Sequence, residues 1–469
     1  MLCPVDWLPM WRRNVKENWE LSFWKRFSYA FGNYPSTIIP ALIIAWVMVF
    51  YCPPPDSGKM VFAPIVLLGV ARFFGRLVDA LADPIIGFWS DRIRTRWGRR
   101  IPFIFIGTLP LSICFYLLWF PPVEGESILN VLWAALMLGL IWFFYTVVVA
   151  PYLALGAEVT SVTDERVNIS VWQAIFEVVG NVTVQLGLGG ILKRYAQGLG
   201  FMTSGYQVAA LIIAILTFLG FYFSILWVRE KPPSAAKEVP FGFLDAFRLT
   251  FQNRPFCIYL ATIALLRLSV DIVLMMIPYM ALTAMRADEL AGARGLALIM
   301  IVAVLFFGLM GYLTRAWGLK TLYLRSLVLF AVICFFFATV GRWGIFSPKL
   351  QGLIMCGLLG VPVAALMSLW RPIVAELADY DEQRTGYRRE AIYFGVEGLA
   401  TKFAEGISAL SVGVFFSVLG YSVEQHLGVI LAGPLAGLIA LVACLVFRRY
   451  PLGQPGKSLE GGPGENLSA

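Results

Sequence analysis

Histidine is almost absent from this sequence, because His426 is the only one among its 469 residues. A histidine-based metal site or catalytic triad is therefore not expected. The seven cysteines are scattered, mostly within apolar runs, and no two form a CxxC pair. The sequence thus indicates neither a disulfide framework nor a zinc site. No GxxxxGK[ST] motif for ATP binding occurs either, so we expect any energy to come from an ion gradient, with no metal, no organic cofactor and no enzymatic activity.

Charged residues are also scarce, at 14% of the chain, whereas a soluble domain averages about 25%. With 59% hydrophobic residues and a mean hydropathy of +0.76, the composition predicts a polytopic membrane protein. The net charge of +8 does not indicate nucleic-acid binding, because the basic residues form short clusters between apolar runs. Such clusters are typical of orientation signals beside a lipid bilayer.

Twelve apolar segments are long enough to cross a bilayer, and the polar stretch REKPPSAAKEVP divides them six and six. The ends of the second and eighth segments, GFWSD and GYLTR, repeat each other weakly. We therefore predict an all-α protein of two pseudo-symmetric six-helix bundles, an architecture that binds cargo between its halves. The predicted spans are 28–51, 61–89, 101–120, 129–157, 167–191, 207–228, 256–284, 291–314, 321–341, 351–378, 390–418 and 426–447.

The domain organisation follows from these spans. It comprises a cytoplasmic arm (1–27), a first bundle (28–228), a cytoplasmic linker (229–255), a second bundle (256–450) and a disordered Gly/Pro-rich tail (451–469). Most basic loops fall on the side of the two termini, which predicts that both termini are cytoplasmic. No signal-peptide cleavage pattern precedes the first span. We expect a monomer in a plasma membrane of the bacterial inner-membrane type.

A stripe of charge runs through the second span. Its residues, at offsets of 0, 4, 7 and 11, share one face of a helix at about 100° per residue; they are Arg72, Arg76, Asp79 and Asp83. Each charge at the bilayer centre costs roughly 2.5–3.5 kcal/mol, so the stripe should face protein or water. Two carboxylates one turn apart favour a small-cation or proton site, flanked by an arginine charge network. The alternative is a buried ion-pair network that only joins helices.

The fifth span carries a polar residue every four positions, namely Gln173, Glu177, Asn181 and Gln185. The stripe either lines a cargo cavity or packs helices through hydrogen bonds. Among the many aromatic residues, one or two, such as Tyr145, are expected to stack on cargo.

The second bundle has its own charged residues. Arg267 and Asp271 are spaced i, i+4 and form either a structural pair or a cargo contact. Glu397, Lys402 and Glu405 cannot all share one helix face. We take Glu397 as a cavity candidate and Glu405 as the i+3 partner of Lys402.

The loop after the second span is rich in arginine. An acidic residue at the end of the preceding helix, Asp91, suggests an ion-pair latch between the two halves in the outward-facing state. The preference for positive charge in cytoplasmic loops would by itself also explain the arginines. The predicted latch comprises Gly87, Asp91, Arg92, Arg96, Gly98, Arg99 and Arg100.

This loop resembles the signature of the major facilitator superfamily. More specifically, RLVDALADPIIGFWSDRIRTRWGRRIPF, DYDEQRTGYRREAIYFGVEGLATK and SYAFGNYP resemble the glycoside–pentoside–hexuronide, melibiose-permease-like cation symporter family. The resemblance implies H⁺- or Na⁺-coupled symport of a small solute, such as a sugar or glycoside, by alternating access. It makes Asp79 and Asp83 the cation-coordinating carboxylates, Thr146 a further oxygen ligand, and Lys402 a neighbour of the site.

The sequence departs from melibiose-type members in two respects. Ala82 replaces an asparagine, which favours H⁺ over Na⁺ because a proton needs only one carboxylate. Thr37 and Val149 occupy the positions of sugar-binding aspartates, and valine accepts no hydrogen bond. The alternatives are therefore a carrier of an amphiphile such as a lysolipid, or an uncoupled facilitator. An intramembrane enzyme is disfavoured, because two carboxylates on one helix rarely oppose a scissile bond. A scaffold or receptor without transport is the remaining alternative, and the absence of any flux in proteoliposomes would indicate it.

Overall fold

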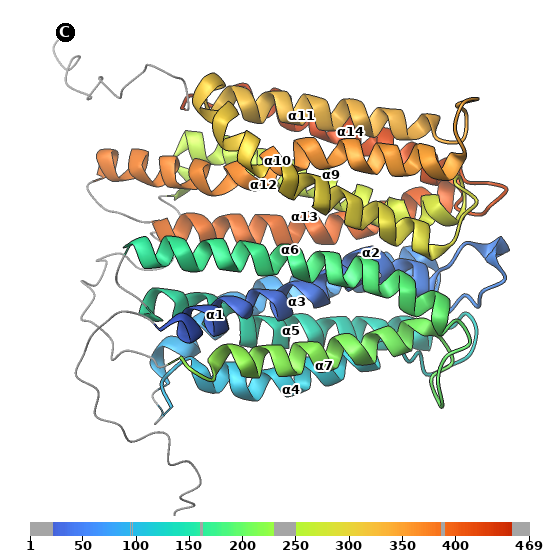
Figure 1. Ribbon diagram of the computed structural model, residues 1–469, viewed down its shortest axis with the longest axis horizontal. Coiled ribbons are helices and arrows are strands. Elements are labelled where there is room, and N and C mark those ends of the chain that lie inside the picture. Colours follow the sequence, from blue (N-terminus) through green and yellow to red (C-terminus); the bar gives the residue numbers. More distant parts are fainter. Residues whose placement is uncertain are drawn as a thin grey trace, which may run out of the picture.

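The computed structural model describes residues 22–93, 95, 97–159, 163–228, 250–385 and 390–452. Within these ranges the regular structure is helical, apart from isolated bridges such as Thr95–Gly98. Figure 1 shows long helices running side by side, with the described ends of the chain at one end of the bundle. We call this the terminal end, and the opposite end, which carries residues 52–64, the distal end.

The first half of the chain forms seven helices. They are α1 (Phe23–Phe31), α2 (Asn33–Tyr51), α3 (Ile65–Arg92), α4 (Ile101–Leu117), α5 (Ile128–Val159), α6 (Thr163–Arg194) and α7 (Gly205–Ile225). The second half forms α9 (Arg254–Leu282), α10 (Glu289–Trp317), α11 (Leu319–Phe336), α12 (Pro348–Thr385), α13 (Glu390–Leu419) and α14 (Leu427–Phe447). Short 3₁₀ turns at Pro55–Ser57 and Phe337–Thr339 complete the described secondary structure.

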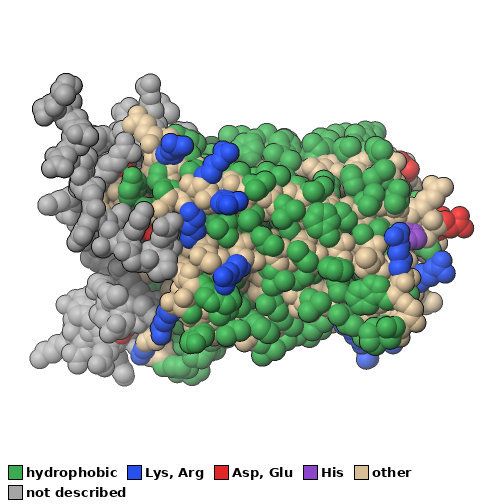
Figure 2. Space-filling model, turned by 90° about the horizontal axis from the view of Figure 1, so that it is seen from above, with side chains coloured by type: hydrophobic (Ala, Val, Ile, Leu, Met, Phe, Trp, Pro, Cys, Tyr) green, Lys and Arg blue, Asp and Glu red, His purple; other side chains and the backbone are tan. Residues whose placement is uncertain are grey.

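Ten helical segments are long and apolar enough to cross a membrane, with α1 and α2 together forming one of them. The remaining two are α4, which has 17 residues, and α3, which carries the charged stripe. The predicted all-helical, twelve-span architecture is therefore confirmed. Figure 2 shows a broad hydrophobic belt, with Lys and Arg side chains gathered toward its two ends. Such a belt fits a lipid environment.

Helix ends differ from the predicted spans where local chemistry decides. The helix α3 begins at Ile65 rather than near 61, because the residue before Pro64 is restricted to extended backbone. The helix α12 runs for 38 residues, well beyond the roughly 20 needed to span a bilayer. The helix α1 crosses the boundary expected at 27/28, and α9 begins inside the expected linker. Most of the arm, the linker and the tail lies outside the described residues.

The two bundles meet along α3 and α13, α6 and α10, and α2 and α9. Glycines let α3 and α13 approach closely. A Cβ atom at Gly413 would lie 2.8 Å from the Ile65 carbonyl oxygen, and one at Gly69 would lie 2.9 Å from the Ala409 carbonyl oxygen. This packing turns the charged stripe of α3 toward the second bundle.

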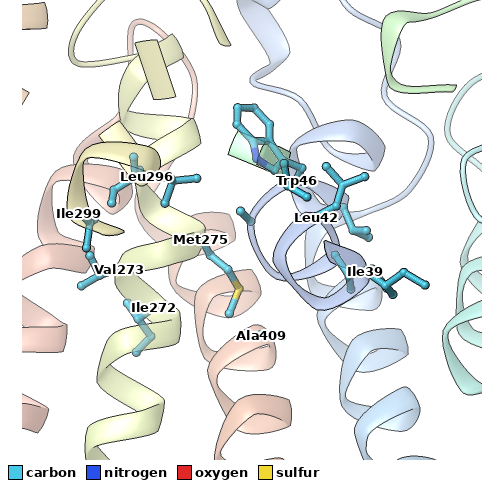
Figure 3. Close-up of a cluster of buried hydrophobic side chains, with 14 of the residues drawn as sticks. Ile39, Leu42, Trp46, Ile272, Val273, Met275, Leu296, Ile299 and Ala409 are labelled. Atoms are coloured by element: carbon cyan, nitrogen blue, oxygen red, sulfur yellow. The ribbon is translucent and has the colours of Figure 1, made fainter. Parts of the chain in front are cut away.

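Apolar side chains fill the interface beside these charges. Figure 3 shows Ile39, Leu42 and Trp46 of α2 facing Met275 of α9 across the interface. Trp46 also donates a 3.0 Å hydrogen bond from Nε1 to Oε1 of Gln185 in α6. The charged groups therefore lie beside a largely apolar part of the boundary between the bundles.

Candidate cation and cargo site

Two carboxylates, one hydroxyl and one ammonium converge between α3, α5 and α13. Lys402 Nζ lies 2.9 Å from Oδ1 of Asp79 and 2.7 Å from Oδ2 of Asp83. The Thr146 hydroxyl donates to Oδ1 of Asp79 at 2.6 Å and lies 3.4 Å from Oδ1 of Asp83. The structure thus brings together all four residues expected around the cation, which we call the cation cluster.

Exposure differs sharply within the cation cluster. The Asp79 side chain is 1% exposed, whereas that of Asp83 is 42% exposed and that of Lys402 19% exposed. One carboxylate is therefore sealed and the other is accessible. Ala82, which is buried beside them, adds no oxygen. The Lys402 ammonium lies between the two carboxylates.

Arg76 connects this cluster to a second group of charges. Its Nη1 lies 3.1 Å from Oδ2 of Asp79, and its guanidinium carbon lies 3.4 Å from the ring centroid of Trp142. Its other terminal nitrogen forms an ion pair with Glu405. The stacking and the two ion pairs hold the guanidinium plane in one orientation.

Glu405 is the residue whose role the sequence interpretation missed. We expected it to pair with Lys402, but the structure instead places its carboxylate between Arg76 and Arg267. Arg267 Nη2 lies 2.6 Å from Oε1 of Glu405, and Arg267 Nε lies 3.5 Å from Oδ2 of Asp271. Arginine side chains therefore hold a second pair of carboxylates, those of Asp271 and Glu405. We call these two carboxylates and the arginines that hold them the arginine cluster.

A small enclosed cavity of about 10 Å³ lies at this junction, room for roughly one water molecule. Arg72 faces it and donates from Nη1 to Met275 Sδ at 2.9 Å. Asp271 also lines it, and neither of its carboxylate oxygens accepts a hydrogen bond within the described part of the chain. The cavity is bounded by Ile43, Ile44, Arg72, Arg76, Trp142, Asp271 and Glu405.

The fold and this geometry point to membrane transport, and the family comparison decides the matter. The model of the family described as "MFS/sugar transport protein" matches residues 22–454. The chain belongs to this family. It is a multi-pass membrane protein of the major facilitator superfamily, in agreement with the resemblance seen in its motifs.

Several similar proteins are named transporters or symporters. The isoprimeverose transporter of Lactiplantibacillus pentosus is 22% identical over 86% of this chain and 81% of its own. The inner membrane symporter YicJ of Escherichia coli is 28% identical, but the match covers only 46% of this chain and 45% of that protein. The sodium-dependent lysophosphatidylcholine symporter 1 of Gallus gallus is 23% identical over 94% of this chain and 88% of its own.

Solved structures support the fold. A D-xylose–proton symporter superposes with a TM-score of 0.62 at 15% identity, covering 91% of this chain and 96% of that chain. The nucleoside transporter NupG superposes with a TM-score of 0.59 at 13% identity, covering 91% and 97%.

The polar stripe of α6 has a mixed outcome in this transporter. Gln173 Nε2 donates to the Tyr152 hydroxyl at 3.1 Å, and Gln185 accepts from Trp46, so both join helices. Asn181 Nδ2 donates to the Glu177 carbonyl oxygen at 3.3 Å within its own helix. Glu177 itself lies within electrostatic reach of Arg267 and Arg371.

Three other cavity candidates form their hydrogen bonds with groups outside both charged clusters. The Thr37 hydroxyl donates to the Asn33 carbonyl oxygen at 2.7 Å, and Tyr145 donates to the Ser36 carbonyl oxygen at 2.8 Å. Val149 is buried. Glu397 accepts from the Tyr259 hydroxyl at 2.9 Å, so it belongs to the contact between α13 and α9 inside the second bundle.

The predicted latch is only partly within the described structure. Arg96 and the side chains of Asp91 and Arg92 lie outside the described residues, so the latch stays a prediction. Gly98 has a φ of 112°, which favours glycine and closes the turn with Thr95. Arg100 donates to the Ala154 carbonyl oxygen of α5, a contact within the first bundle.

Proposed function

We propose that the protein is a secondary active transporter that couples a small cation to the symport of a sugar or glycoside-like solute. The observation that carries the proposal is the cation cluster, in which Lys402 of the second bundle bonds Asp79 and Asp83 of the first. A tethered ammonium that joins two mobile halves can be exchanged for a free cation. The names of the sugar-transporting relatives support the cargo class.

The coupling follows from competition for the two carboxylates. An arriving cation or proton removes negative charge from Asp79 and Asp83, which weakens their hold on Lys402 and therefore the bond between α3 and α13. The halves can then rearrange around bound cargo. Because coupling is reciprocal, cargo that favours the same state raises cation affinity by the same factor. We propose H⁺ as the coupling ion, since a proton needs only one carboxylate of the pair, whereas Ala82 offers no side-chain oxygen to Na⁺.

The orientation is part of the same proposal. Basic loops predominate at the terminal end, which we place in the cytoplasm of a plasma membrane. The described halves are joined at the distal end by α2 and α9, where the Tyr279 hydroxyl donates to the Cys52 carbonyl oxygen at 2.8 Å. By contrast, α5 of the first bundle and α12 of the second make at most marginal contact within the described residues.

The test is uptake into proteoliposomes under an imposed pH or Na⁺ gradient, screened across sugars and glycosides. Asp83→Asn should abolish accumulation against a gradient while leaving the protein folded. Glu397→Gln, which neutralises a buried carboxylate of the second bundle, is the matched control. Accumulation by the Asp83→Asn variant at a steep gradient would contradict the proposal.

A second cargo class has its own support. An apolar groove of about 400 Å³ lies between the first two helices and α7, lined by residues such as Phe31, Leu219 and Phe223. One acyl chain could occupy such a groove. The relative from Gallus gallus that is named a sodium-dependent lysophosphatidylcholine symporter matches 94% of this chain. Transport of a lysolipid, with no response to sugars in the same vesicles, would favour this amphiphile carrier.

A further inference from the structure

Guanidinium groups from both bundles share the Glu405 carboxylate. Arg76 reaches it from α3 of the first bundle and Arg267 from α9 of the second. Its side chain is only 12% exposed, so these ion pairs are weakly screened by water. It lies three residues after Lys402 on α13, next to the cation cluster but bonded to different partners.

The ion pairs form one continuous chain. Asp79 bonds Arg76, Arg76 bonds Glu405, Glu405 bonds Arg267, and Arg267 lies beside Asp271. Arg76 is thus divided between two carboxylates, and Glu405 between two guanidiniums. A change in the charge of Asp79 therefore alters how strongly Glu405 holds Arg267.

The charges of this interface also balance. The four basic groups are Arg72, Arg76, Arg267 and Lys402, and the four acidic groups are Asp79, Asp83, Asp271 and Glu405. A bound cation adds one positive charge to this balanced set, so the ion pairs must redistribute. Glu177 of α6 also lies within electrostatic reach of Arg267.

We propose that Glu405 is a positioning residue that relays cation occupancy to the cargo side of the interface; this inference rests on the proposed symport. When a cation neutralises Asp79, Arg76 pairs more fully with Glu405, and Glu405 loosens its hold on Arg267. The Arg267 guanidinium, whose side chain is 36% exposed, then becomes available beside Asp271 for polar groups of the cargo. The pair Arg267 and Asp271 supplies both hydrogen-bond donors and acceptors, which suits a hydroxylated solute.

The relay predicts that Glu405→Gln and Arg267→Gln change the affinity for the cation in opposite directions. Glu405→Gln leaves Arg76 to Asp79 alone, so a cation must compete with a stronger ion pair and should bind at least about tenfold more weakly. Arg267→Gln leaves Glu405 to Arg76 alone, which frees Asp79, so a cation should bind several-fold more tightly. A purely structural cluster would respond to both losses with weaker binding, because each leaves a buried charge without a partner.

The experiment measures cation binding to the purified full-length protein in nanodiscs. Thermal stabilisation is followed during a NaCl titration at fixed pH and during a pH titration without Na⁺. Trp142 fluorescence, isolated by comparison with Trp142→Phe, reports the movement of Arg76 in the same samples. Glu405→Asp keeps the charge and should recover most of the wild-type affinity, which guards against a folding artefact. Glu397→Gln should match the wild type in the NaCl titration.

The outcomes separate the two proposals. A wild-type protein that responds to neither Na⁺ nor protons would overturn the proposed symport itself. A responsive wild type whose Glu405→Gln and Arg267→Gln variants shift in opposite directions supports the relay. Shifts in the same direction, or no shift for Glu405→Gln, overturn the relay and leave the symport standing.

Discussion

The two carboxylate pairs at the bundle interface differ in the cation that lies between their members. An ammonium, Lys402, bridges Asp79 and Asp83, with Arg76 as a second partner of Asp79, whereas only guanidiniums pair with Glu405 and Asp271 among the ion pairs of the described residues. An ammonium is a compact point charge, but a guanidinium is a planar fork that fixes its partners in orientation. A small ion can therefore replace the first kind of partner more readily than the second.

Access differs in the same sense. The Asp83 side chain is 42% exposed, whereas the side chains of Asp271 and Glu405 are 1% and 12% exposed. An ion from solution can reach the cation cluster, but it must displace buried ion pairs to reach the arginine cluster. On the proposed mechanism, one pair exchanges ions and the other transmits the change in charge.

Lys402→Arg should have the largest effect, because it gives the cation cluster the kind of partner found in the arginine cluster. Charge is kept, but a forked guanidinium bonded to both carboxylates resists displacement, so cation-driven uptake should fall by more than about 100-fold. Initial rates in proteoliposomes measure this. Near-normal uptake would break the comparison, since it would show that the type of cation does not matter.

Gly413→Ala should disturb both pairs together, because both depend on the spacing of α3 and α13. The new methyl group would meet the backbone oxygen of Ile65 at 2.8 Å, and backbone cannot rotate away. Overpacking of this kind destabilises by about 1–3 kcal/mol. Thermal unfolding in detergent should show the loss, with weaker cation binding and slower uptake. Gly395→Ala, on the same helix but with open space around its Cβ position, is the control.

Periodicity within one helix was sufficient to place Asp79 and Asp83 on a single face of α3, and the apolar segments were sufficient to predict the twelve spans. The role of Glu405 could not be predicted in this way. Its partners come from α3 and α9, which lie far from it in sequence, and a helical wheel gives a direction without naming the neighbour.

Glu397 shows the same limit. It lies eight residues before Glu405 on the same helix, yet its partner is Tyr259 inside the second bundle. Gln185 could equally have lined a cavity, but Trp46 on the facing helix takes its side-chain oxygen. In each case the deciding contact is between helices, which composition and spacing within one helix do not specify.

Arg267→Lys is a milder test of the arginine cluster. A lysine keeps the charge but cannot reach Glu405 and Asp271 with separate nitrogens of one plane, so solute uptake should fall about fivefold. The Na⁺ and proton titrations should change less than in Arg267→Gln, because Glu405 still has a cationic partner. A loss as large as that of Lys402→Arg would erase the distinction between the two clusters.

The smallest effect is expected at an ion pair outside both clusters, between Lys59 at the distal end and Glu289 at the start of α10. Burial lowers the pKa of the Lys59 ammonium, but its side chain is still 42% exposed, and an exposed pair contributes only about 0–1 kcal/mol. Lys59→Ala should therefore change the rate of solute exchange across the bilayer by no more than about fivefold, and this difference should fade at high salt. The double substitution Lys59→Glu with Glu289→Lys should restore the rate. This pair joins the two halves without touching Asp79 or Asp83. Its loss should therefore change the cation affinity measured without cargo only indirectly, by shifting the balance between inward- and outward-facing states. A large direct loss of cation affinity would mean that charge is transmitted along the whole interface, and not through Glu405 alone.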